Sequence, residues 1–222
     1  MGETVVTDTN VLLNMATPVI DGRPDAPSGA DPLKTLLTAY DVHVPTSVLA
    51  ELTDATGSED LLSAAADLVL QAAHHLTKHD VDAQLTEPLD YGLDRGESEC
   101  IWLANELPAD LFITDEFNTI NYLFVTLALD DRNILFTTPH ILCSLVTHEF
   151  LPVKYVDSAL TYYVETKGWD AQYVAQSARE NQSRSRRDAS PTSRGDRVTH
   201  RVLGSECGYR TVHRVDSSPR HQ

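Results

Sequence analysis

Thr4-Val5-Val6-Thr7-Asp8 and Leu111-Phe112-Ile113-Thr114-Asp115 are two short apolar runs that each end in an aspartate. Runs of this length and composition predict β-strands. If the two strands are parallel neighbours, both aspartates project from the same edge of the sheet. Because ligand and metal sites of open α/β sheets lie beyond the carboxyl ends of the strands, the two runs predict a site at that edge.

The rest of the chain alternates strand-like and helix-like segments, a pattern typical of a parallel sheet covered by helices. A turn leads from the first strand into residues 11–14, and a loop follows at 17–32. We expect further strands at 42–44, 76–81 and 134–136. We expect helices at 32–39, from Pro45 through Glu51, at 58–75, 94–106, 118–129 and 139–147, and a closing helix at 155–177 that is interrupted near Gly168. The fold class is therefore α/β, a three-layer sandwich with a central, mostly parallel sheet of about four or five strands.

The chain divides into three parts by composition. Its 222 residues, 41% of them hydrophobic, suffice for one domain with a sizeable core. We expect an α/β domain at 1–150, the closing helix at 151–178, and a disordered Arg/Ser-rich tail at 179–222. The tail is interpreted either as a basic arm for RNA phosphates or as a non-contributing extension.

Charge is distributed unevenly between these parts. Residues 179–222 hold ten arginines and five acidic residues, a net charge of +5, whereas the preceding residues hold seven basic and 28 acidic residues, a net charge of −21. Only four lysines occur in the chain. An acidic, lysine-poor domain resembles the proteins of salt-loving archaea, because molar salt shortens the screening length to about 3 Å and makes self-repulsion tolerable. A halophilic source is therefore one hypothesis, and an ordinary acidic protein is the other.

Two glutamates lie between the strand-terminal aspartates in the sequence. Glu51 lies on a helix beside the inward-facing Val48 and Leu52, and Glu97 opens the helix that Asp94 caps. Asp94 and Glu97 have the spacing of a capping box, but the same placement also holds a metal ligand rigidly. Four carboxylates that converged on one rim would form an oxygen-ligand pocket for a divalent cation.

In their order and spacing, four segments resemble the PIN-domain nucleases, including toxin ribonucleases of the VapC type. The segments are Val6-Thr7-Asp8-Thr9-Asn10-Val11-Leu12-Leu13, Val44-Pro45-Thr46-Ser47-Val48-Leu49-Ala50-Glu51-Leu52, Leu93-Asp94-Arg95-Gly96-Glu97-Ser98-Glu99-Cys100-Ile101-Trp102-Leu103-Ala104 and Leu111-Phe112-Ile113-Thr114-Asp115-Glu116. The resemblance implies that Asp8, Glu51, Glu97 and Asp115 bind Mg²⁺ or Mn²⁺ and catalyse hydrolysis of RNA phosphodiesters, with Asn10 and Glu116 accessory. It also implies an RNA substrate, homodimerisation and, for a toxin, an antitoxin partner. Relatives often carry a basic residue after the fourth acid, where this chain has Phe117-Asn118-Thr119.

Several other functions are alternatives to this one. An RNA-binding, RNA-processing or assembly module of the same fold, with weak or no catalysis, is the main alternative. A haloacid-dehalogenase-type phosphatase needs an acid where Asn10 stands. The histidines at 74, 75 and 79 lack the further ligands that zinc requires, and no phosphate-binding glycine loop occurs.

The expected location is the cytoplasm, without membrane association. Cys100, Cys143 and Cys207 lie far apart, which fits a reducing compartment. Neither a secretory leader nor an apolar run of membrane-spanning length is visible in the sequence.

Overall fold

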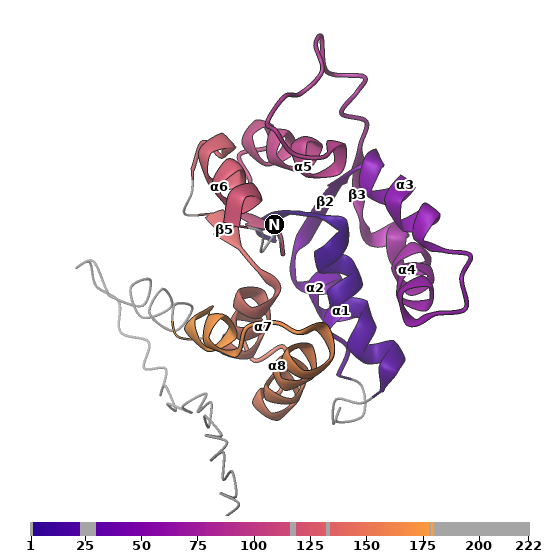
Figure 1. The fold of residues 1–222 in the computed structure, drawn as a ribbon, viewed down its shortest axis with the longest axis vertical. Coiled ribbons are helices and arrows are strands. Elements are labelled where there is room, and N and C mark those ends of the chain that lie inside the picture. Colours follow the sequence, from indigo (N-terminus) through magenta and orange to yellow (C-terminus); the bar gives the residue numbers. More distant parts are fainter. Residues whose placement is uncertain (1, 23–29, 116–118, 132–133, 178, 180–222) are drawn as a thin grey trace, which may run out of the picture.

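A computed structural model of the chain describes residues 2–22, 30–115, 119–131, 134–177 and 179. Its centre is a five-stranded parallel sheet with the strand order β3-β2-β1-β4-β5 (Figure 1). The strands are β1 (Thr4–Thr7), β2 (Asp41–Pro45), β3 (Thr77–His79), β4 (Leu111–Ile113) and β5 (Leu135–Phe136). All five lie within or next to segments that the sequence predicts as strands, and the predicted α/β sandwich is confirmed.

Helices connect the strands and cover the sheet (Figure 1). They are α1 (Thr9–Asp21), α2 (Pro32–Ala39), α3 (Thr46–Ala55), α4 (Leu61–Ala72), α5 (Arg95–Glu106), α6 (Thr119–Ala128), α7 (Thr138–Thr147) and α8 (Val153–Lys167), and a short 3₁₀ turn, η1 (Ala73–His75), follows α4. Residues 171–177 form a further short helical segment after Gly168, which ends α8 in the left-handed conformation. No helix among the described residues is long and apolar enough to cross a membrane.

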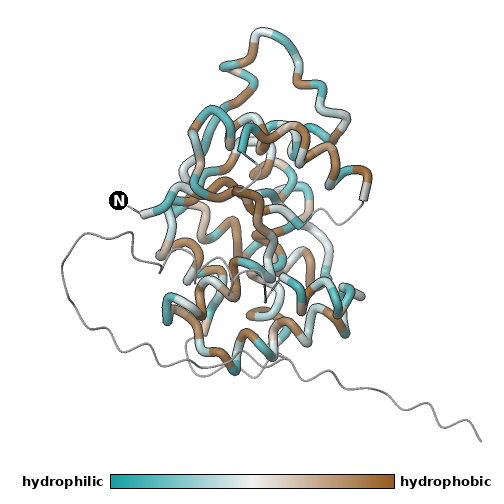
Figure 2. The backbone as a smooth tube through the Cα atoms, turned by 90° about the vertical axis from the view of Figure 1, so that its left-hand side faces the viewer, coloured by the Kyte–Doolittle hydropathy of each residue, from teal (hydrophilic) through white to brown (hydrophobic). Residues whose placement is uncertain are grey.

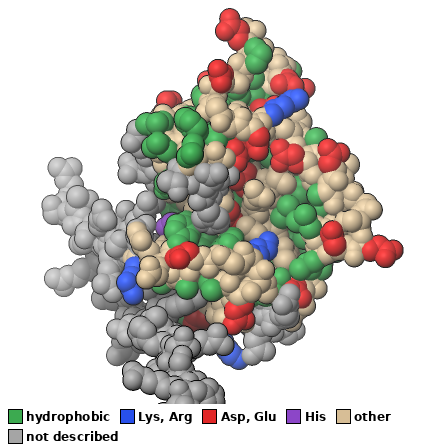
Figure 3. All heavy atoms as spheres, viewed as in Figure 1, with side chains coloured by type: hydrophobic (Ala, Val, Ile, Leu, Met, Phe, Trp, Pro, Cys, Tyr) green, Lys and Arg blue, Asp and Glu red, His purple; other side chains and the backbone are tan. Residues whose placement is uncertain are grey.

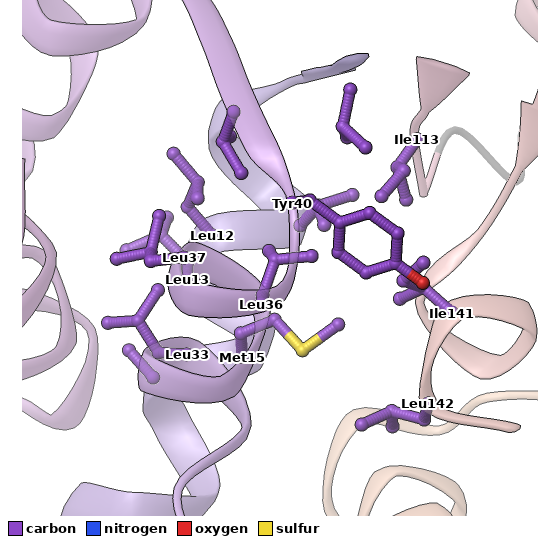
Figure 4. Close-up of a cluster of buried hydrophobic side chains, with 14 of the residues drawn as sticks. Leu12, Leu13, Met15, Leu33, Leu36, Leu37, Tyr40, Ile113, Ile141 and Leu142 are labelled. Atoms are coloured by element: carbon purple, nitrogen blue, oxygen red, sulfur yellow. The ribbon is translucent and has the colours of Figure 1, made fainter. Parts of the chain in front are cut away.

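Side chains from α1, α2 and α7 interlock beneath the sheet to form the core (Figure 4). Leu12 and Met15 on α1, Leu36 on α2 and Ile141 on α7 are each completely buried. On the other side, α5 packs across β2, β1 and β4. Hydrophobic segments accordingly run through the middle of the molecule, and the segment between β3 and α5 projects away from it (Figure 2). This packing fixes the strand ends that carry the aspartates.

The prediction of a loop from residue 17 onwards is wrong for its first part, because α1 continues to Asp21. Proline inside a helix lacks the N–H that would bond to the carbonyl four residues earlier, so Pro18 favours a loop in the sequence. In the structure, the carbonyl of Asn14 accepts a hydrogen bond from the hydroxyl of Tyr163 instead, at 2.6 Å. Residues 23–29 of the predicted loop lie outside the described residues.

Candidate active site

The chain changes direction in the sheet between β1 and β4. From β1 it proceeds outward through β2 to β3, and then returns to place β4 on the other side of β1. Thr7 of β1 is in register with Ile113 of β4, so Asp8 and Asp115 follow neighbouring strand ends. In open α/β sheets, the crevice at such a switch of direction is where ligands bind.

Asp8 caps α1 and lies almost completely out of solvent, with 6% of its surface exposed. Its Oδ1 accepts the backbone N–H of Val11 at 2.9 Å, and its Oδ2 accepts the hydroxyl of Thr114 at 2.5 Å. Burial, and then the charge of Asp115, raise the pKa of Asp8 to about 7, although these hydrogen bonds oppose the rise. Asp8 therefore exchanges its proton near neutral pH.

Asp115 is equally buried and has more hydrogen-bond donors around it. Thr138, at the start of α7, donates its backbone N–H to Oδ1 at 2.8 Å and its hydroxyl to Oδ2 at 2.5 Å. The Asn14 amide donates to Oδ2 at 2.6 Å. Burial raises the pKa of Asp115, whereas the bonds from Thr138 and Asn14 and the positive charge of Lys167 lower it.

Glu51 lies on the exposed side of α3, beside the fully buried Val48 and Leu52. The hydroxyl of Thr9 donates to its Oε2. On the other side, Glu51 lies against Gly96 in the first turn of α5: a Cβ built on Gly96 would stand 2.1 Å from Glu51 Oε1. The carboxylate of Glu51 is thus held between the start of α1 and the start of α5.

Glu97 lies in the first turn of α5 and is half-buried. Asp94 caps the helix as predicted, since its Oδ1 accepts the backbone N–H of Glu97 at 2.8 Å. Glu99, two residues on, is the more buried of the two glutamates, at 2% exposure. It accepts a hydrogen bond from Arg95 Nε at 2.6 Å, and Arg95 also pairs with Asp82.

The buried thiol of Cys100 links these acids spatially. Burial raises the pKa of Cys100 well above its ordinary value, and the charges of Asp8, Glu51 and Glu99 raise it further. Asp8 and Glu51 therefore both lie near this thiol, at the same end of the molecule. Yet nowhere in the described part of the chain do three or more His, Cys, Asp or Glu side chains form a group that could hold a metal ion.

Of the predicted cluster, the structure thus pairs Asp8 with Asp115 and places Glu51 nearby, without joining all four acids in one ligand set. Asn10 is exposed beside Asp8, and Glu116 lies outside the described residues. On the face shown in Figure 3, acidic side chains outnumber lysines and arginines, and some of them lie near its middle.

The Asp8–Asp115 pair fits a divalent cation. A carboxylate offers roughly four acceptor positions, and each of these two still has some unused after its hydrogen bonds. Two buried carboxylates with raised pKa values gain from a cation between them. Mg²⁺ is commonly held by only one or two carboxylates together with water and substrate phosphate.

Residues 28–122 match a family model, DUF3368, that describes a PIN domain. The match supports assigning the chain to the PIN-domain family. PIN domains generally have a nuclease fold, so the match supports a hydrolase that acts on nucleic acids. Neither a curated protein nor a solved structure matches the chain. The match includes Glu51, Glu97 and Asp115, while Asp8 precedes it and α7 and α8 follow it.

Sequence reasoning missed the residues that hold the two aspartates in place. Thr114 bonds to Asp8, and Asn14 and Thr138 bond to Asp115. Lys167 acts one step further out, through Asn14, and Thr9 bonds to Glu51. Thr138 carries a weak signal, because it starts the helix that follows the last predicted strand. Asn14 and Lys167 carry none, since their pairing joins opposite ends of the chain.

Proposed function

We propose that this PIN-domain protein is a Mg²⁺- or Mn²⁺-dependent endoribonuclease. The observation that carries the proposal is the buried pair of Asp8 and Asp115 at the switch between β1 and β4. Burying two carboxylates side by side costs free energy unless a cation or a proton is shared between them. In a PIN-domain nuclease, a bound divalent cation would offset this cost.

In the proposed reaction, Asp8 and Asp115 hold the cation. When bound, the cation supplies positive charge for the phosphate oxygens and lowers the pKa of a water molecule. Thr114 and the Val11 N–H keep the Asp8 carboxylate in position, and Thr138 and Asn14 do the same for Asp115. We assign Glu51 and Glu97 to outer positions, where a carboxylate orients water and accepts its proton.

The test is cleavage of labelled RNA by the purified full chain in the presence of Mn²⁺ or Mg²⁺. We expect cleavage that stops on addition of EDTA and is absent in Asp8→Asn, which keeps the size of the side chain. The matched control is Asp54→Asn, an exposed acid on α3. Equal cleavage by wild type and Asp8→Asn would overturn the assignment, and cleavage of single-stranded DNA alone would overturn the choice of RNA.

One observation favours a second function, an RNA-binding or RNA-processing module with weak catalysis. Within the described residues, the acids do not assemble into a group of three or more, as a weakened site would predict. RNA binding without cleavage, unaffected by EDTA, would favour the module.

For the biological role, we propose the toxin of a toxin–antitoxin pair, with RNA processing as the rival. The target RNA is set by surface shape and loops and not by the acids. An adjacent small gene for a DNA-binding antitoxin, whose product binds this chain in a pull-down, would support the toxin role. Absence of such a gene would favour processing.

We also propose that a second copy of the chain covers α6. Leu123 and Leu127, one turn apart on this helix, are 54% and 58% exposed. The helix carries no acidic or basic side chain, although the chain has a net charge of −16. Two copies can therefore meet at α6 without bringing like charges together, which an acidic protein requires of a contact with itself.

A further inference from the structure

Two residues of α8 bind the same residue of α1. The ammonium group of Lys167 donates to the side-chain Oδ1 of Asn14, and the hydroxyl of Tyr163 donates to the backbone carbonyl of Asn14 at 2.6 Å. Positions four apart on a helix lie on the same face, so Tyr163 and Lys167 form one clamp. We call these two residues the α8 clamp.

The local structure of both α1 and α8 favours the contacts of the clamp. Pro18 has no N–H to offer the carbonyl of Asn14, so that carbonyl has room for the Tyr163 hydroxyl. Directly after Lys167, Gly168 ends α8, and the ring of Trp169 stacks on the Tyr163 ring at a centroid distance of 4.6 Å. Tyr163 itself is fully buried. The clamp is thus built into the end of the helix.

The nitrogen of the Asn14 side-chain amide faces the candidate active site. Asn14 Nδ2 donates to Asp115 Oδ2 at 2.6 Å. An amide has donors on its nitrogen and acceptor positions on its oxygen, whereas the lysine ammonium only donates and the carboxylate only accepts. Lys167 on one side and Asp115 on the other therefore permit one orientation of the amide.

We propose that Lys167 is a positioning residue: it fixes the Asn14 amide, which in turn holds Asp115 in the geometry that the metal site needs. The inference rests on the proposed function of Asp115 as a cation ligand. It extends the site to α8, beyond the family match at residues 28–122. Groups that orient a ligand from behind typically change metal affinity or activity by roughly 10- to 100-fold when they are removed.

The first test needs neither metal nor RNA. Chains labelled with ¹⁵N at asparagine are compared by NMR as wild type, Lys167→Met, Lys167→Arg and Lys154→Met, where Lys154 is an exposed lysine on the same helix. Asn14→Asp identifies the Asn14 side-chain signal. In Lys167→Met, we expect that signal to shift and its protection from hydrogen exchange to fall roughly tenfold, the loss of about one hydrogen bond. Lys154→Met should leave it unchanged, and Lys167→Arg should restore most of the protection.

The second test measures Mn²⁺ binding by titration calorimetry and RNA cleavage by initial rates in the same proteins. We expect Lys167→Met to weaken Mn²⁺ binding and lower kcat roughly tenfold each, with KM for RNA nearly unchanged. An unchanged Mn²⁺ affinity with a raised, salt-dependent KM would overturn the proposal, because Lys167 would then contact the substrate phosphate.

The two tests separate failure of the inference from failure of the proposed function. If wild type does not cleave RNA, the NMR and Mn²⁺ measurements still decide the positioning role. An unchanged Asn14 signal in Lys167→Met overturns that role whether or not the chain is a nuclease. Should Lys167→Met fail to fold, Tyr163→Phe removes the other half of the clamp. An unchanged Asn14 signal together with wild-type Mn²⁺ affinity in Tyr163→Phe then overturns the clamp.

Discussion

Glu51 and Gly96 touch across the gap between α3 and α5, and a methyl group on Gly96 would lie 2.1 Å from Glu51 Oε1. No L side chain fits there unless Glu51 moves. Gly96 is helical and buried, so its lack of a side chain is required for space and not for an unusual backbone angle. The start of α5 thereby sets where the Glu51 carboxylate lies.

The variant Gly96→Ala should separate activity from stability. Alanine favours a helix over glycine by about 0.5–1 kcal/mol, and the obstructing atom is the end of a flexible side chain. We therefore expect an unchanged or slightly raised melting temperature and a roughly tenfold loss of cleavage, as for other displaced supporting groups. Initial rates and thermal unfolding check this, and full activity in Gly96→Ala would show that the position of Glu51 does not matter.

Cleavage should rise with pH through about 7. The pKa of Asp8 is raised to about 7, and Asp8 must lose its proton to bind a cation. A metal ion competes with that proton, so the midpoint should move to lower pH as the Mn²⁺ concentration increases. Rate profiles between pH 5 and 9 at two Mn²⁺ concentrations provide the measurement, and a midpoint independent of Mn²⁺ would contradict it.

In the absence of metal, the free energy of unfolding should fall as pH rises, whereas cleavage should increase. Because the folded pKa of Asp8, about 7, lies above its ordinary value of 3.8, the folded chain binds more protons than the unfolded chain between these values. The free energy of unfolding therefore falls as pH rises from about 4 to about 7. Urea unfolding in EDTA should show a shallower fall for Asp8→Asn than for wild type. An identical slope in both proteins would mean that Asp8 titrates normally.

Stability should also rise with salt. The residues before 179 carry a net charge of −21, and the screening length falls from about 10 Å at 0.1 M to about 3 Å at 1 M. We expect the melting temperature to increase steadily between 0.1 and 2 M KCl, to a degree typical of a halophilic protein. Full stability in dilute buffer would instead indicate an ordinary acidic protein.

Self-association should depend on α6. Leu123→Glu places a charge on the exposed apolar face, so two copies would bring like charges together. We expect light scattering after gel filtration to report a dimer for wild type and a monomer for Leu123→Glu. Leu62→Glu, on α4, is the control because Leu62 is similarly exposed, at 49%. A wild-type monomer would refute the contact.

The sequence allowed the fold to be predicted because strand and helix signals are local. Each strand is a short apolar run, and Asp31 and Asp94 cap their helices as their spacing predicts. The two aspartates at strand ends follow from the same local reasoning. The extension of α1 past Pro18 could not be predicted in this way. The hydroxyl that replaces the missing N–H donor comes from Tyr163, which is remote in sequence.

The residues that support the acids of the site could not be predicted, for a related reason. Asn14 meets Asp115, and Lys167 meets Asn14, only through the docking of helices that are remote in sequence. No spacing rule connects such positions. The burial of Glu99 likewise depends on how α5 lies against the sheet.

The bond between Tyr163 and Asn14 makes the support of the candidate site depend on a helix that is synthesised late. During synthesis, β1 and α1 leave the ribosome long before α8 has been made, and domains begin to fold in that order. Until α8 docks, the carbonyl freed by Pro18 lacks Tyr163, and Asp115 lacks the finished support of Asn14. The pair of Asp8 and Asp115 therefore acquires its full support only after α8 has been synthesised and has docked against α1.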